Sequence, residues 1–185
     1  LGMNRGDYML IDLSNVLSEP HKSLDETVPC TLEVFQSKLG TFPVLSKEDV
    51  YITIDYVKDR QIEIHGTCGL VIEIPCDRCL EPVPTEFHLD FTKKVEAGVS
   101  EEEKMDSDEF DESNYIDGYA LDVDKLIYNE VLIGWPTKIL CSEDCKGICN
   151  VCGQNLNQGT CSCEDTSLDP RMSVIRDVFK NFKEV

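Results

Sequence analysis

Residues 50–75 read VYITIDYVKDRQIEIHGTCGLVIEIP. Apolar and polar residues alternate from Val50 to Val57, pause at the polar turn Lys58-Asp59, and alternate again from Gln61 to Ile74. A period of two is typical of strands that bury one face. The stretch therefore predicts two strands of an antiparallel sheet. The alternating apolar residues are Val50, Ile52, Ile54, Tyr56, Ile62, Ile64, Leu70, Ile72 and Ile74.

Three more strands are expected around this pair, at Met9 to Leu13, Cys30 to Phe35 and Glu86 to Val95. Gly66 and Gly69 interrupt the long alternating run and indicate a bulge or a bend at that point. Several short strands separated by turn signals predict a small antiparallel sheet or a partly open barrel.

A dense acidic run follows the β-rich part. Between Glu96 and Asp124 there are twelve acidic residues and a single basic one, Lys104. Charge blocks of this kind usually form solvated, flexible linkers. The alternative is that the run is a docking strip for a basic partner.

Two helices are expected after the acidic run. Asp122 is a suitable N-cap for a helix that extends to Ile133 and that Gly134 ends. Asp169-Pro170 opens a second helix, with aspartate at the cap and proline at the first helical position. We therefore expect an α+β fold in three consecutive parts. These are a β-rich domain at residues 1–95, an acidic linker at 96–120, and a segment at 121–185 that contains a helix, a Cys-rich zinc-binding stretch and a C-terminal helix.

Composition narrows the class of protein. The 185 residues suit one domain, or one domain with a small appendage. No apolar run reaches the roughly 18 residues that a membrane span needs. The beginning, LGMNRGDYMLIDL, lacks the pattern of a signal peptide, so we expect a cytoplasmic protein. A formal net charge of −19 disfavours broad contact with nucleic-acid phosphates and favours basic protein partners.

Six of the ten cysteines lie within 23 residues, in the segment CSEDCKGICNVCGQNLNQGTCSC at 141–163. Short C-x2-C and C-x-C pairs on either side of a turn suit a tetrahedral ion such as zinc. The predicted main ligands are Cys149, Cys152, Cys161 and Cys163. Alternate residues of a strand face opposite ways, so one member of the C-x-C pair could miss the ion. Cys141 and Cys145 are then the alternates.

A separate pair, Cys76 and Cys79, follows the long alternating run. It has three interpretations. The pair could hold a second metal together with Cys141 and Cys145, it could be redox-active, or it could consist of buried structural thiols. A redox C-x-x-C normally begins a helix, which lowers the thiol pKa, whereas this pair follows a strand.

Nothing in the sequence forms a catalytic pattern. An all-cysteine cluster is typical of a closed, structural zinc site, because catalytic zinc keeps an open position. Neither a P-loop, a GxGxxG motif nor an HExxH motif is present. We therefore expect a protein that is not an enzyme, with structural zinc and no small-molecule substrate.

Two separated motifs carry a resemblance to a known family. Cys76-Asp-Arg-Cys79-Leu-Glu-Pro82 resembles the C-x-R-C-L-x-P box of the YceD family of bacterial and plastid proteins. The later run Cys145-Lys-Gly-Ile-Cys149-x-x-Cys152-Gly-x-Asn-Leu-Asn, followed by C-x-C and Asp169-Pro-Arg171, resembles the signature of its Cys-rich Gram-positive members.

The resemblance implies a non-enzymatic factor for accumulation of 23S ribosomal RNA and assembly of the large ribosomal subunit. Acidic character suggests action through a basic ribosomal protein or a pre-50S particle, with contact to the RNA indirect. A direct contact would need basic residues such as Lys93, Lys94, Arg171, Arg176, Lys180 and Lys183. The alternative function is a zinc-ribbon interaction module of a transcription or other regulatory complex.

Overall fold

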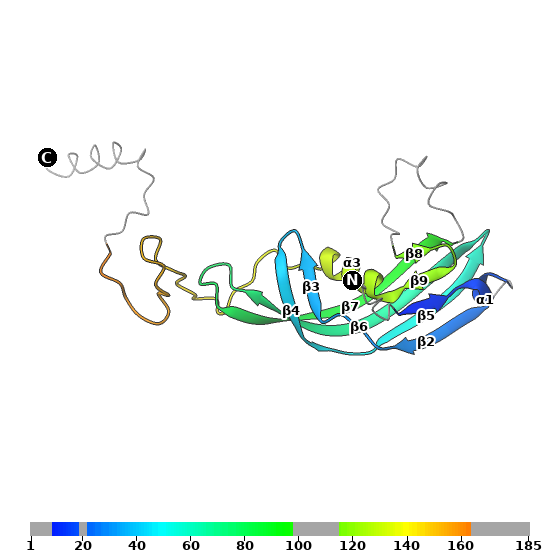
Figure 1. The fold of residues 1–185 in the computed structure, drawn as a ribbon, viewed down its shortest axis with the longest axis horizontal. Helices are drawn as coiled ribbons and strands as arrows, with labels where there is room; N and C mark the ends of the chain where they lie inside the picture. The colour runs from blue at the N-terminus through cyan, green and yellow to red at the C-terminus, as the bar shows by residue number, and fades with distance from the viewer. Residues whose placement is uncertain (1–8, 19–21, 98–114, 164–185) are drawn as a thin grey trace, which may run out of the picture. The chain divides into compact units, whose positions relative to one another are not determined.

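The computed structural model describes residues 9–18, 22–97 and 115–163. Most of these residues lie in antiparallel strands (Figure 1). The chain divides into two compact units. The first, here called the sheet unit, comprises Leu1–Ile74 and Pro84–Thr137. The second, here called the cysteine unit, comprises Pro75–Val83 and Lys138–Val185.

A six-stranded sheet forms most of the sheet unit (Figure 1). Its strands are β2 (Ser23–Val28), β3 (Val34–Ser37), β4 (Gly40–Lys47), β5 (Val50–Lys58), β6 (Gln61–Pro75) and β7 (Pro82–Glu96). The order is β2-β5-β6-β4-β3, and β7 also pairs with β6. The long strand β6 is therefore the centre of the sheet, with β5 paired to its first half and β4 to its second.

The hairpin between β5 and β6 follows directly from the sequence. Lys58 and Gln61 are paired, so the loop has two residues, Asp59 and Arg60, with φ of 47° and 66°. Two-residue hairpins favour turns with positive φ at both central positions, because their twist matches that of the strands. Alternation then places every even-numbered residue from Ile62 to Ile74 on the buried face.

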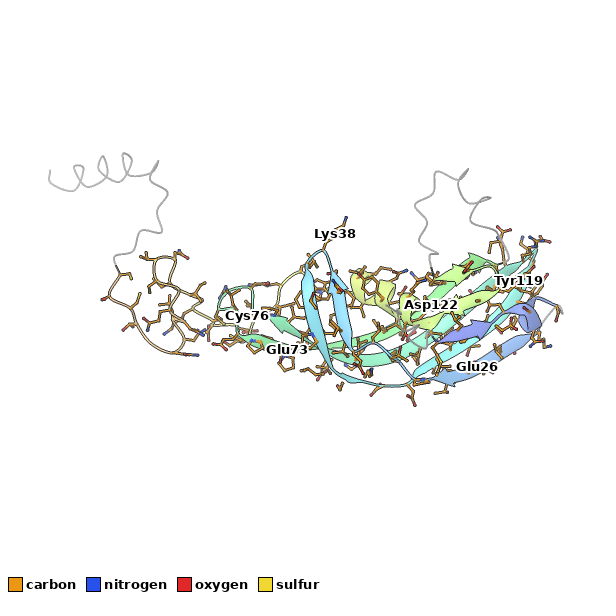
Figure 2. The ribbon with its side chains drawn as sticks, in the orientation of Figure 1. Glu26, Lys38, Glu73, Cys76, Tyr119 and Asp122 are labelled. Atoms are coloured by element: carbon orange, nitrogen blue, oxygen red, sulfur yellow. The ribbon has the colours of Figure 1, made fainter. Side chains whose placement is uncertain are left out.

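A second, three-stranded sheet has the order β1-β9-β8. Its strands are β1 (Leu10–Asp12), β8 (Ile116–Asp117) and β9 (Ala120–Asp122), and the short helix α1 (Ser14–Leu17) follows β1. Figure 2 labels Tyr119, just before β9, and Asp122, at its end. The last part of the predicted acidic linker thus contributes strand residues.

Helix α3 (Val123–Ile133) begins and ends where the capping signals predicted. The side chain of Asp122 accepts a hydrogen bond from the backbone N–H of Lys125, and Gly134 is the C-cap. Directly after the helix, Trp135 lies against the rings of Phe35, Phe42 and Phe87, with centroid distances of 5.2, 5.3 and 5.8 Å. This aromatic cluster joins three strands to the end of α3.

The predicted α+β class is wrong. In the described residues the fold is mainly antiparallel β, with only α1 and α3 as helices. The sheets are also open and do not close into a barrel. The error arose because segments 23–28 and 40–47 show little clean alternation yet pair with the strongly alternating β5 and β6. The predicted C-terminal helix lies outside the described residues.

Two local predictions also need correction. The strand expected at Cys30 to Phe35 is instead a connection that leads into β3 at Val34. No bulge occurs at Gly66 in the pairing with β5, where Ile52 and Gly66 are regular partners. Glycine is needed there for another reason, since the ring of Phe91 occupies the space of a Cβ. None of the helices in the described part of the chain is long and apolar enough to cross a membrane.

Candidate metal centres in the cysteine unit

The first C-x-x-C pair lies in the tight loop that connects β6 to β7. Figure 2 labels Cys76 at this position. The backbone N–H of Cys76 donates to the carbonyl of Glu81 at 2.8 Å, and the N–H of Leu80 donates to the carbonyl of Cys76 at 3.0 Å. Leu80 has φ of 62°, in the left-handed region. This loop, residues 76–81, is called knuckle 1.

The second C-x-x-C pair has the same backbone. The N–H of Cys149 donates to the carbonyl of Gln154 at 2.9 Å, and the N–H of Gly153 donates to the carbonyl of Cys149 at 2.9 Å. Gly153 has φ of 74°, at the position that corresponds to Leu80. The loop of residues 149–154, called knuckle 2, therefore repeats knuckle 1 bond for bond.

Both knuckles turn backbone N–H groups towards sulfur. In knuckle 2 the N–H of Val151 donates to Sγ of Cys149 at 3.4 Å. Such donors stabilise a thiolate and are typical of cysteine metal loops. Glycine suits the fifth position because it adopts positive φ without strain, whereas Leu80 does so at a cost of about 1–2 kcal/mol.

Knuckle 1 meets a second pair of cysteines from a distant part of the sequence. The sulfur atoms of Cys76 and Cys145 are 3.8 Å apart, and those of Cys79 and Cys141 are 3.4 Å apart. All four sulfurs lie within 4.8 Å of one another. Three of the four residues are buried, and Cys141 is exposed. We call this group the buried cluster.

Knuckle 2 meets the C-x-C pair. The sulfur atoms of Cys149, Cys152, Cys161 and Cys163 also lie within 4.8 Å of one another. Their side chains are half-buried or exposed, so we call this group the exposed cluster. The four predicted main ligands are thus together. The concern about the C-x-C pair does not apply, because residues 161–163 are not in a strand.

Both clusters have the dimensions of a four-thiolate metal site. Sulfurs bound to zinc at about 2.3 Å in a tetrahedron lie about 3.8 Å from one another. The cysteines are free thiols, and separations of 3.4 and 3.8 Å far exceed the roughly 2.05 Å of a disulfide bond. Either cluster could close around one ion with small side-chain movements.

Charge repulsion within each cluster also favours a cation. Burial raises the pKa of Cys76, but backbone N–H groups of Cys79, Arg78 and Cys141 lower it to about 6. Backbone N–H groups of Cys152 and Val151 lower the pKa of Cys149 to about 6.

In each cluster another thiol responds in the opposite direction. In the exposed cluster, the hydrogen bond from Cys163 to Cys152 raises the pKa of Cys163 to about 12. One thiol of a cluster therefore ionises easily while another resists, and four thiolates need a divalent cation to coexist.

The buried cluster depends on contacts that join segments 62 residues apart. The N–H of Asp77 donates to the carbonyl of Ile139 at 2.9 Å, and the N–H of Ile139 donates to Oδ2 of Asp77 at 2.6 Å. The guanidinium group of Arg78 donates to the carbonyl of Cys145 at 2.8 Å. A Cβ on Gly147 would lie 3.0 Å from the carbonyl oxygen of Arg78, so this close approach requires glycine.

The roles of several of these residues were not evident from the sequence. Cys141 and Cys145 do not replace a member of the C-x-C pair. They join Cys76 and Cys79, which was one of the three interpretations of that pair. The role of Asn157, which donates to Sγ of Cys145 at 3.2 Å, was missed. Its only signal was its place in the family-like run that ends Asn-Leu-Asn.

The basic residues suggested for a direct RNA contact are engaged or undescribed. Lys93 forms an ion pair with Glu130 at 3.0 Å, and Lys94 forms one with Glu63 at 3.3 Å. The remaining candidates, from Arg171 to Lys183, lie outside the described residues. The described part of the chain therefore offers little support for that contact.

Comparisons with known proteins agree with the motifs. The model of one family, described as large ribosomal RNA subunit accumulation protein YceD, matches residues 64–179. The chain is also 25% identical over 158 residues to the large ribosomal RNA subunit accumulation protein YCED homolog 1, chloroplastic, of Zea mays. That match covers 71% of this chain and 54% of the relative, so the chain spans about half the length of this relative. No solved structure matches the chain.

Proposed function

We propose that this chain, which belongs to the YceD family, promotes accumulation of 23S ribosomal RNA and assembly of the large ribosomal subunit. The family description and the name of the maize relative support the general role. In our proposal the protein acts without catalysis, as a binding factor for a basic protein of the large subunit or a pre-50S particle.

We infer a basic partner from a concentration of carboxylates on the exposed face of the six-stranded sheet. Asp25, Asp55 and Glu63 lie on the neighbouring strands β2, β5 and β6. Asp55 and Glu63 are direct cross-strand partners. Two like charges in this position destabilise a sheet. Lys94 already pairs with Glu63, so a bound cationic group would act mainly on the charge of Asp55.

The rest of the chain adds to the negative electrostatic potential of this face. The sequence contains 36 acidic and 17 basic residues. A surface of this sign attracts basic proteins and accelerates their association, and it repels a bare phosphate backbone. The RNA would then be protected indirectly, through delivery or positioning of its protein partner.

We also propose that zinc at Cys149, Cys152, Cys161 and Cys163 is structural. Four thiolates complete a tetrahedral shell and leave no position for a substrate. The ion would order a segment that has little apolar core of its own, since none of these four residues is buried.

Depletion of the protein in its source cells tests the function. The expected result is a lower ratio of 23S to 16S ribosomal RNA and fewer free large subunits on a gradient. A normal ratio and gradient would refute the assembly role. Co-purification of polymerase subunits without ribosomal proteins would favour the alternative, a zinc-ribbon module in a transcription complex.

Complementation with isosteric variants tests the sheet face separately. Asp25→Asn with Asp55→Asn removes two charges from the sheet face. In depleted cells this double variant is expected to restore the ratio of 23S to 16S ribosomal RNA less well than the wild type and to co-purify with less basic ribosomal protein. The control, Glu143→Gln with Asp144→Asn, removes two charges from exposed positions of the cysteine unit. Equal rescue by both pairs would show that the sheet face does not hold the partner.

A further inference from the structure

We propose that Cys76, Cys79, Cys141 and Cys145 form a second tetrathiolate metal site, and that Asn157, from the loop between the two ligand pairs of the exposed cluster, positions it. The ligand is a soft divalent cation, Zn²⁺ or Fe²⁺. The chain would then hold two metal ions, and occupation of the exposed cluster would strengthen binding at the buried one.

The surroundings of the buried cluster argue against a purely apolar role for its thiols. Cys76, Cys79 and Cys145 are 0%, 5% and 3% exposed and pack against Val83, Leu140 and Ile148. Buried cysteines that serve only as small apolar groups need no polar partners. Here one side-chain amide donates directly to a sulfur, and the Arg78 guanidinium fixes the backbone of Cys145.

Knuckle 1 also retains a strained backbone. Leu80 has positive φ although its side chain is 64% exposed, so packing does not hold it in this conformation. The corresponding residue of knuckle 2 is glycine. Left-handed backbone in a residue with a Cβ persists where the surroundings require it, and it clusters at ligand sites. Matching hydrogen bonds in the two knuckles indicate that both loops have the backbone conformation of a metal-binding loop.

Asn157 connects the two clusters. Its Nδ2 donates to Sγ of Cys145 at 3.2 Å, and its Oδ1 accepts from the N–H of Lys146 at 2.8 Å. An amide held in this way orients the thiolate and spreads its charge, as outer-shell donors do at metal sites. Asn157 lies between Cys152 and Cys161, two residues of the exposed cluster.

The loop that contains Asn157 also forms hydrogen bonds with knuckle 1. Asn155 and Gln158 both donate to Oε1 of Glu81, at 3.0 and 3.1 Å. The N–H of Leu156 donates to the carbonyl of Gly147 at 2.8 Å. A metal in the exposed cluster would close this loop at both ends, which lowers the entropy cost of keeping Asn157 against Cys145. Occupation of either cluster would therefore strengthen binding at the other.

Metal analysis of the purified full chain tests the second site. The wild-type protein should hold two equivalents of zinc, and Cys76→Ser with Cys145→Ser should hold one. Unchanged fluorescence of Trp135 would show that the sheet unit remains folded. One equivalent in the wild type, or no loss of metal in the double variant, would overturn the second site.

Cobalt substitution tests the role of Asn157. Asn157→Ala should still bind two Co²⁺ ions, but with a shifted sulfur-to-cobalt charge-transfer band. The ion of the buried cluster should be released to a chelator about 10-fold to 100-fold more readily than in the wild type, as for other outer-shell changes. The control is Asn150→Ala, an exposed asparagine within knuckle 2. If the two variants have the same spectra and release curves, Asn157 does not position the site.

Discussion

Replacement of Gly66 by alanine is expected to destabilise the sheet unit, because the new methyl group would collide with a buried ring. A Cβ built on Gly66 lies 2.4, 2.8 and 3.1 Å from three ring atoms of Phe91. Phe91 is only 7% exposed, so its ring cannot move aside without disturbing its neighbours. Overpacking of this kind costs about 1–3 kcal/mol.

Part of this cost is offset in the unfolded chain. Exchange of glycine for alanine reduces the freedom of the unfolded state and stabilises a protein by about 0.4–1 kcal/mol where the backbone permits it. We therefore expect a net loss of about 1–2 kcal/mol, which lowers the melting temperature by about 2–8 °C at 2–4 °C per kcal/mol.

Gly69, in the same strand, offers a matched control. Its Cβ would meet Oε2 of Glu48 at 2.5 Å, but that atom is the far end of a flexible, exposed side chain. Gly69→Ala should therefore change the free energy of unfolding by less than about 0.5 kcal/mol, or raise it slightly.

The assay is urea unfolding followed by fluorescence. Trp135 is the single tryptophan, and its contacts with Phe35, Phe42 and Phe87 make it a reporter of the sheet unit. A second change, Phe91→Leu, should cost less in the Gly66→Ala background than in the wild type, since the collision is already relieved. Equal stability of Gly66→Ala and Gly69→Ala, or strict additivity with Phe91→Leu, would refute the collision.

Three further outcomes are expected. Asp124→Ala should lower the free energy of unfolding by about 1–3 kcal/mol in the same assay, because the buried carboxylate accepts hydrogen bonds from both the N–H and the hydroxyl of Thr31. A loss no larger than that caused by replacing an exposed aspartate with alanine would contradict this. The hydrogen bond from Cys68 lowers the pKa of Cys30 from its usual 9.0 to about 7, so the free energy of unfolding should rise between pH 7 and pH 9 and fall again as the pH drops through 7. Cys68→Ala should abolish that rise, and an unchanged pH profile in this variant would count against the thiol pair. Removal of metal by a strong chelator should make the cysteine unit sensitive to protease while the fluorescence of Trp135 persists, and equal resistance with and without chelator would exclude metal as its main support.

The sequence predicted well those features whose signals are local. Alternation over residues 50–75 identified β5 and β6, and the Asp122 cap with Gly134 identified α3 within a residue of its ends. A hairpin and a helix cap are decided by residues a few positions apart. The C-x-x-C spacing likewise predicted that knuckle 2 and the C-x-C pair belong together.

Strand pairing was harder to predict. Segments 23–28 and 40–47 are strands because of the neighbours they hydrogen-bond to, β5 and β6, and their own patterns are weak. The predicted fold class was wrong for this reason. Gly66 is a related case, since its glycine is required by a ring from β7 and not by the local backbone of β6.

The partners of Cys76 and Cys79 were decided only by tertiary structure. Cys145 lies 69 residues beyond Cys76, and Cys141 lies 62 beyond Cys79. Sequence spacing limits which ligands can meet within one short loop, but it carries no information on which distant segments come together. That choice follows from the hydrogen bonds between knuckle 1 and the residues around Ile139 and Cys145. The sequence thus shows that cysteines suited to a four-thiolate site are present. Which four cysteines come together depends on long-range contacts that form only when the chain folds.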